Sequence, residues 1–310
     1  MTKKRSRQQK APMNAAKRNS IRRNLFHAAL PSVEPWDGFD WHQWRGHYDT
    51  DKPHSSQALA IDVFGSLQQL SCRDTVLNAF MSRMGYESNG AWTVDLEWRV
   101  PGDLLGESGH PTQVDAMASS RNLVVFFECK LTEKQAGSCS HAKRITEGPH
   151  EGKRQCNGRY ELQTNPTNGK SATCSLAGIG IKYWDYIPRL LEIDHEEASK
   201  ACPFKGEDYQ WMRNVVACAA KAEKDNKKGV FFVVYADLPE ERGVSLSRCA
   251  RESWPRFRET VKPGTIDVGE VSYLDLLDVA TEAAGTDADV IRELRSWVED
   301  KARRAASHRS

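Results

Sequence analysis

The first clear hydrophobic pattern in the chain is a helical one. Ser55 and Ser56, which are both good helix caps, stand before apolar residues three or four positions apart: Leu59, Val63, Leu67 and Leu70. This stripe predicts a helix over residues 55–70. A second helix is expected over residues 73–84, because a glycine follows it directly.

Alternation with a period of two follows these helices and predicts strands. Within residues 91–100, charged side chains alternate with the apolar residues Val94, Leu96, Trp98 and Val100. Two further strands are expected over residues 112–118 and 123–131, the second of them strongly apolar. Residues 119–122, Ser-Ser-Arg-Asn, connect these two strands and predict a hairpin.

The second half of the chain predicts helices around one buried strand. Residues 229–236 are a short, wholly apolar run, the pattern of a strand covered on both faces. The order of the core elements is therefore α-β-β-β-α-β, which predicts an α/β fold with a mixed sheet flanked by helices. The expected helices of this half span residues 179–193, 208–225, 246–260, 273–281 and 286–305.

These elements predict one domain with two basic ends. The domain is expected over residues 31–300, and it begins with a turn-rich aromatic segment. Residues 133–178 are rich in Gly, Pro, Asn and Ser without a sustained period, so they predict an insertion or a long loop. Residues 1–30 predict a flexible basic tail, with a helical segment near 14–25, and residues 301–310 predict a second basic tail.

The formal charge of +2 hides an uneven distribution. The first 23 residues hold nine Lys or Arg and no acid, and the last ten hold four more, again with no acid. Without these thirteen residues, 31 basic residues face 42 acidic ones, which leaves a body of charge −11. Basic tails attract polyanions, although a solubilising or frayed terminus would have the same composition.

Several classes of protein are excluded or disfavoured. No apolar run approaches the length of a membrane-spanning helix, and the basic N-terminus has no apolar stretch of a secretory signal after it. Eight cysteines without an export signal favour reduced thiols over disulfides. We therefore expect a cytoplasmic protein without a membrane partner.

Candidate chemistry lies where the third predicted strand ends. Glu128 and Lys130 follow Val124 and Phe126 on one face of that strand, where charged groups are costly unless they are paired or used. The predicted hairpin can bring Asp115 close to Glu128. Glu97, on the first strand, offers a further carboxylate, and carboxylates that converge near a lysine suit Mg²⁺. A strand-end ion pair of Glu128 and Lys130 with an unrelated aspartate is the alternative.

Asp115, followed by Glu128-Cys129-Lys130, resembles the D…(D/E)-x-K motif of the PD-(D/E)xK nuclease superfamily. The flanking runs, together with the Ser55–Gly65 stretch, resemble a bacterial family of predicted restriction endonucleases, over residues 54–240. The resemblance implies a restriction-endonuclease-like αβββαβ core with added helices. It also implies that Asp115 and Glu128 hold Mg²⁺, that Lys130 is the catalytic lysine and that Glu97 is an additional acid. Val114 stands where the motif often has proline.

A second candidate site involves cysteines of the loop-rich segment. Three or four thiolates there could hold Zn²⁺ or an iron–sulfur cluster, with His141 or His150 as substitute ligands. The spacings are long and lack a C-x₂-C pair, so ordinary free or buried thiols are the alternative. The candidate ligands are Cys139, Cys156, Cys174 and Cys202.

The prediction for function is a Mg²⁺-dependent nuclease that hydrolyses DNA, of the restriction or defence type. The alternatives are a repair or processing nuclease of the same fold, and a catalytically silent nucleic-acid-binding protein with a cysteine metal site. Residues 130–159 carry seven basic and three acidic residues, a local charge of +4 that favours contact with a phosphate backbone. Enzymes that cut both strands often pair, so a homodimer is one expectation.

Overall fold

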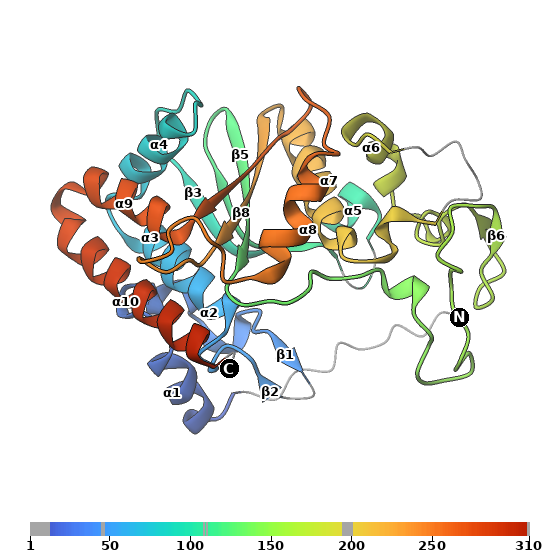
Figure 1. Cartoon of the computed structure of the whole chain (residues 1–310), viewed down its shortest axis with the longest axis horizontal. Coiled ribbons are helices and arrows are strands. Elements are labelled where there is room, and N and C mark those ends of the chain that lie inside the picture. The colour runs from blue at the N-terminus through green and yellow to red at the C-terminus, as the bar shows by residue number, and fades with distance from the viewer. Residues whose placement is uncertain (1–12, 45–46, 108, 110, 194–200, 309–310) are drawn as a thin grey trace.

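A five-stranded mixed sheet forms the centre of the protein, with helices on both sides (Figure 1). The computed structural model describes residues 13–44, 47–107, 109, 111–193 and 201–308. Neighbouring strands are antiparallel from β3 to β5, and β5–β8 and β8–β9 are parallel pairs. The predicted α/β class with a mixed sheet is therefore confirmed. In sheet order, the strands are β3 (Thr93–Arg99), β4 (Gln113–Ser119), β5 (Leu123–Lys130), β8 (Lys228–Tyr235) and β9 (Asp267–Ser272).

Each face of the sheet buries its own hydrophobic core. Alternate residues of β5 divide between the two: Val125, Phe127 and Cys129 face one core, and Val124 and Phe126 face the other. The first core is covered by α2 (Ser56–Ala60), α3 (Ser66–Gln69), α4 (Arg73–Arg83), α9 (Tyr273–Ala283) and α10 (Ala288–Ser307). The second is covered by α5 (Gly102–Leu105), α6 (Tyr183–Leu190), α7 (Asp208–Asp225) and α8 (Arg248–Arg258).

The hairpin register decides which polar side chains meet. The pair β4–β5 places Ala116 opposite Phe127, and the pair β3–β4 places Leu96 opposite Ala116. Extending these registers by one residue sets Asp115 between Glu128 of β5 and Glu97 of β3. The predicted hairpin is confirmed, and it brings carboxylates of three adjacent strands to one end of the sheet.

Both chain ends pack more closely than their composition predicts. The helix α1 (Ala15–Arg23) and the turn after it bury Ile21, Leu25 and Phe26, so a flexible tail over residues 1–30 is wrong for residues 13–30. Residues 1–12 lie outside the described residues. At the other end, α10 continues to Ser307 and buries Lys301, so a basic tail from residue 301 is wrong as far as residue 307.

Small elements complete the chain. The pair β1 (Gln43–Trp44) and β2 (His47–Tyr48) lies in the aromatic segment before α2. The segment between β5 and α6 follows an irregular path, with the short pair β6 (Gln163–Thr164) and β7 (Ser171–Ala172) at one edge of the molecule (Figure 1).

The strand β9 lies between the predicted helices 246–260 and 273–281, where the sequence predicts no element. Asp267, Gly269 and Glu270 interrupt its apolar pattern, but the apolar strand β8 pairs with it in parallel. Gly269 lies against the ring of Phe232, where a Cβ atom would approach a ring carbon to 2.7 Å. The edge strand is thus formed by pairing and close contact with its neighbour.

Candidate active site

The predicted catalytic residues line one cavity at the end of β5. Its volume is about 280 Å³. Glu97, Asp115, Glu128 and Lys130 all contribute to its wall, so the structure brings together the four residues that the sequence singled out. The other lining residues are His42, Ser56, Gln113, Cys129, Glu133, Gln135 and Gln210.

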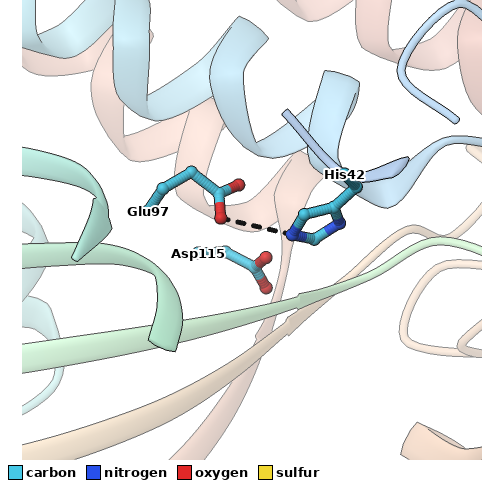
Figure 2. Close-up of side chains that lie close together, drawn as sticks. All are labelled: His42, Glu97 and Asp115. Carbon is cyan, nitrogen blue, oxygen red and sulfur yellow. Dashed lines mark ion pairs between the residues drawn. The ribbon is translucent and has the colours of Figure 1, made fainter. Parts of the chain in front are cut away.

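Within this cavity, Asp115 and Glu97 form a compact group with His42 (Figure 2). One ligand atom from each of the three residues lies within 4.8 Å of the others. His42 Nε2 is 3.2 Å from Glu97 Oε2, and Asp115 Oδ2 accepts a hydrogen bond of 2.7 Å from the backbone N–H of Cys129. A carboxylate of β4 is thereby fixed beside a carboxylate of β3.

Glu97 reaches this group from an unusual backbone conformation. Its φ angle is +50°, a region that non-glycine residues rarely adopt, and it falls between two regular pairs of the β3–β4 ladder. Gln57 Nε2 donates to its Oε1 at 2.8 Å, and the Gln113 amide donates to its Oε2. Backbone strain of this kind concentrates at functional sites and persists where surrounding contacts enforce it.

Glu128 lines the same cavity but is held by a separate set of donors. Lys130 Nζ and Gln210 Nε2 each donate to Glu128 Oε1 at 2.6 Å, and Asn214 Nδ2 donates to Oε2 at 2.7 Å. Lys130 Nζ also lies 5.4 Å from the centre of the Trp211 ring. The glutamate and lysine of the motif are therefore a buried, preorganised pair, not an exposed strand-end pair.

The cavity concentrates negative charge in a buried place. Burial, together with the charges of Glu128 and Glu97, raises the pKa of Asp115 well above its usual range. Burial lowers the pKa of His42, but the hydrogen bond and charge of Glu97 and the charges of Asp115 and Glu128 outweigh it and raise that pKa to about 9. Burial also opposes the charge of Lys130, yet Glu128 and Glu133 hold its pKa above the usual range.

This set of donors fits a hard divalent cation. Mg²⁺ prefers oxygen ligands and needs only a few carboxylates, because it keeps several waters. Two buried carboxylates lie side by side with a third in the same cavity, and their mutual repulsion favours a cation between them. Glu97, Asp115 and Glu128 are the residues that could hold it.

Three polar residues of the site escaped the sequence analysis. His42 lies in the aromatic segment without a period, and no pattern there distinguishes it. Gln210 and Asn214 lie on α7 and both donate to Glu128. Gln210 and Asn214 are four residues apart, so they lie on the same face of α7, among apolar residues. That face packs on the strand that bears Glu128, so the pattern could have predicted two polar side chains close to Glu128.

The other predicted site residues lie outside this cavity. Cys139, Cys156, Cys174 and Cys202 line a second one, together with His141, whereas His150 is not among its lining residues. Beyond Lys130, the basic residues of the 130–159 segment are exposed.

The comparisons with known proteins identify the family. Among the described residues, no helix is long and apolar enough to cross a membrane. Searches of curated proteins and of solved structures find no match to this chain. A family model described as "Restriction Endonuclease associating with ARP" matches residues 2–296, nearly the whole length. The chain therefore belongs to this family of restriction-endonuclease-like proteins.

Proposed function

We propose that this protein is a Mg²⁺-dependent endonuclease that hydrolyses DNA phosphodiester bonds in the cytoplasm, as a restriction or defence enzyme with a PD-(D/E)xK active site. The observation that carries the proposal is the convergence of Glu97, Asp115 and Glu128 beside Lys130 in one cavity. Membership of a restriction-endonuclease family supports the reaction and the substrate.

Each residue of the cavity has a defined part in this proposal. Asp115 and Glu97 are the first ligands of the cation, and Glu128 joins them on the side of Lys130. The bound Mg²⁺ would supply an activated water and neutralise charge that develops on the phosphate. Lys130, fixed by Glu128 and lying near Trp211, orients the attacking water and adds positive charge beside the phosphate.

His42 balances charge in this arrangement. With a pKa of about 9, it is protonated at neutral pH and donates from Nε2 to Glu97. The imidazolium thus offsets part of the repulsion among the carboxylates. A cation held by Glu97 and Asp115 would take over this charge balance from His42.

A basic groove within the cysteine-bearing segment supports DNA as the substrate. Arg144 and Arg154 face each other across an antiparallel bridge and line a groove of about 490 Å³ with Asn157, Gln163 and Thr164. Both arginines are exposed, and no ion pair of the described residues includes either. Two like charges held side by side without a carboxylate suit a phosphate backbone.

The test is cleavage of mixed-sequence genomic DNA by the purified full-length chain, with Mg²⁺ and with EDTA. Methylated and unmethylated DNA are both supplied, so that a target sequence or its modification does not mask activity. Cleavage is expected with Mg²⁺ alone. Lys130→Met should lower its rate about a hundredfold or more, because it removes a preorganised charge at the reacting phosphate.

Lys224→Met is the matched control, because Lys224 lies exposed near the end of α7, outside the cavity. It should leave the rate unchanged. Intact DNA of both kinds, or equal rates for wild type and Lys130→Met, would overturn the proposed function.

A further inference from the structure

Four cysteines between β5 and α7 line a single small cavity: Cys139, Cys156, Cys174 and Cys202. All four are free thiols. We propose that they hold an iron–sulfur cluster. This inference is independent of the proposed nuclease activity, because it rests on other residues in another cavity.

The four cysteines reach the cavity from separate turns. Cys139 directly precedes the short helix η4 (Ser140–Ala142), Cys202 precedes η6 (Pro203–Lys205), and Cys174 lies just before η5 (Ala177–Ile179). Cys156 lies in irregular chain. Cys139, Cys174 and Cys202 pack against the edge of the second core, whereas Cys156 is not among the residues that pack there, so apolar packing accounts for only part of this arrangement. A loop-rich segment needs a local anchor, and a four-thiolate centre would supply one.

The spacing of the sulfurs favours a cluster over a single zinc ion. Four thiolates on one tetrahedral zinc, at Zn–S distances of about 2.3 Å, hold their sulfurs about 3.8 Å apart. Among the described residues, the one group of three or more ligand atoms within 4.8 Å of one another is His42, Glu97 and Asp115. The cysteine sulfurs are therefore spread more widely. An iron–sulfur cluster suits that spacing, because its thiolates bind different irons around a core of sulfide.

The surroundings of the cavity complement the negative charge of a thiolate-bound cluster. The backbone N–H of Gly158 donates to Cys156 Sγ at 3.3 Å, the type of hydrogen bond that stabilises cluster thiolates. Arg159 and Lys205 contribute to the wall. Gly158 has a φ angle of +79°, a left-handed backbone conformation that favours glycine, and it lies against the side chain of Lys205.

A direct path of hydrogen bonds joins this segment to the catalytic cavity. Gly137, two residues before the first cysteine, donates its N–H to Gln210 Oε1 at 2.9 Å and accepts from Gln210 N–H at 3.2 Å. Gln210 in turn donates to Glu128 at 2.6 Å. The cluster would thus order the chain that follows β5 and fix the helix residue that holds Glu128.

The experiment is metal and sulfide analysis of the full-length chain, purified anaerobically and then reconstituted with ferrous iron and sulfide. We expect iron and acid-labile sulfide in equal amounts, with a broad visible absorption band that dithionite bleaches. Cys156→Ser and Cys174→Ser should each lower the bound iron at least tenfold. The control Cys72→Ala, at a buried free thiol of the other core, should keep it.

Far-UV circular dichroism identifies variants that remain folded, and His141→Ala provides a further comparison. His141 lines the cavity but hydrogen-bonds Ser175, so it should retain the iron. A folded protein that takes up zinc in place of iron, that stays colourless after reconstitution, or that keeps its iron in both serine variants would overturn the proposal. None of these results depends on DNA cleavage.

Discussion

The buried ion pair between Asp62 and Lys301 makes a quantitative prediction about folding. It joins the helical segment after α2 to α10, and neither side chain has any exposed surface. Asp62 Oδ2 accepts from Lys301 Nζ at 2.5 Å and from Trp297 Nε1 at 2.9 Å, and its Oδ1 accepts from the backbone N–H of Phe26 at 2.7 Å. Lys301 Nζ also donates to the carbonyl of Asn24 at 2.7 Å.

The perturbation is Lys301→Met, which keeps the unbranched side chain as far as Cε and removes the charged amino group. The remaining carboxylate then stays charged at a large cost or takes up a proton. Protonating an aspartate with an ordinary pKa of about 3.9 costs about 4 kcal/mol at pH 7 and about 1.5 kcal/mol at pH 5, which caps the charge contribution. The lost hydrogen bond to Asn24 adds about 1 kcal/mol at either pH.

The sign of the pH dependence follows from the protons bound. Burial raises the pKa of Asp62 even beside Lys301, and loss of the lysine raises it further. The native variant therefore binds more protons than its unfolded state, so its stability falls as the pH rises above the unfolded pKa. We expect Lys301→Met to lower the free energy of unfolding by at most about 5 kcal/mol at pH 7 and at most about 2.5 kcal/mol at pH 5.

Urea unfolding followed by tryptophan fluorescence measures both values. Arg303→Met is the matched control, since Arg303 lies two residues away on α10 in an exposed pair with Glu240, and it should leave the free energy of unfolding nearly unchanged. Asp62→Asn combined with Lys301→Met should recover much of the loss, because the buried charge is gone. An equal loss at both pH values, or a loss below about 1 kcal/mol at pH 7, would refute the reasoning.

Two further predictions concern the catalytic cavity and the basic groove. The Mg²⁺ concentration for half-maximal cleavage should fall as the pH rises from 6 to 9, because protons on Asp115 and His42, whose pKa values are both raised, compete with the cation. His42→Gln should flatten this dependence at the upper end of the pH range. A wild-type Mg²⁺ requirement that does not change with pH would contradict the prediction. Arg144→Gln combined with Arg154→Gln should weaken DNA binding and reduce the slope of log affinity against log salt by about 1.8, since two phosphate contacts are lost. Filter binding over a series of salt concentrations measures that slope, and an unchanged slope would place the DNA elsewhere.

The sequence predicted four of the five strands and the acidic end of the sheet, because these depend on local alternation and apolar runs, whereas β9 forms by pairing with β8. Because side chains alternate between the two faces of a strand, the sequence showed that Glu128 and Lys130 share one face of β5. The short hairpin connection showed which residues of β4 lie beside β5. The positive φ angle of Glu97 could not be predicted, because contacts from Gln57 and Gln113 impose it. The position of His42 depends on the packing of an aromatic segment without a period.

Composition misled most at the chain ends. Lys301 adds to a basic C-terminus when charges are counted, yet it lies on the apolar stripe of α10, between Val298 and Ala305. That stripe was visible in the sequence. The partner that neutralises the lysine was not, because Asp62 is distant along the chain. A count of charged residues therefore describes the surface of the protein only when the buried ones, such as Lys301, are known.

The dependence of the single-turnover DNA cleavage rate on Mg²⁺ concentration tests the central claim most directly. If Glu97, Asp115 and Glu128 hold the catalytic cation, the wild-type rate rises with Mg²⁺ and saturates, and Asp115→Asn shifts the curve to higher Mg²⁺ or abolishes cleavage. The control Asp95→Asn, on β3 but outside the cavity, should follow the wild-type curve. Superimposable curves for wild type and Asp115→Asn would contradict the claim.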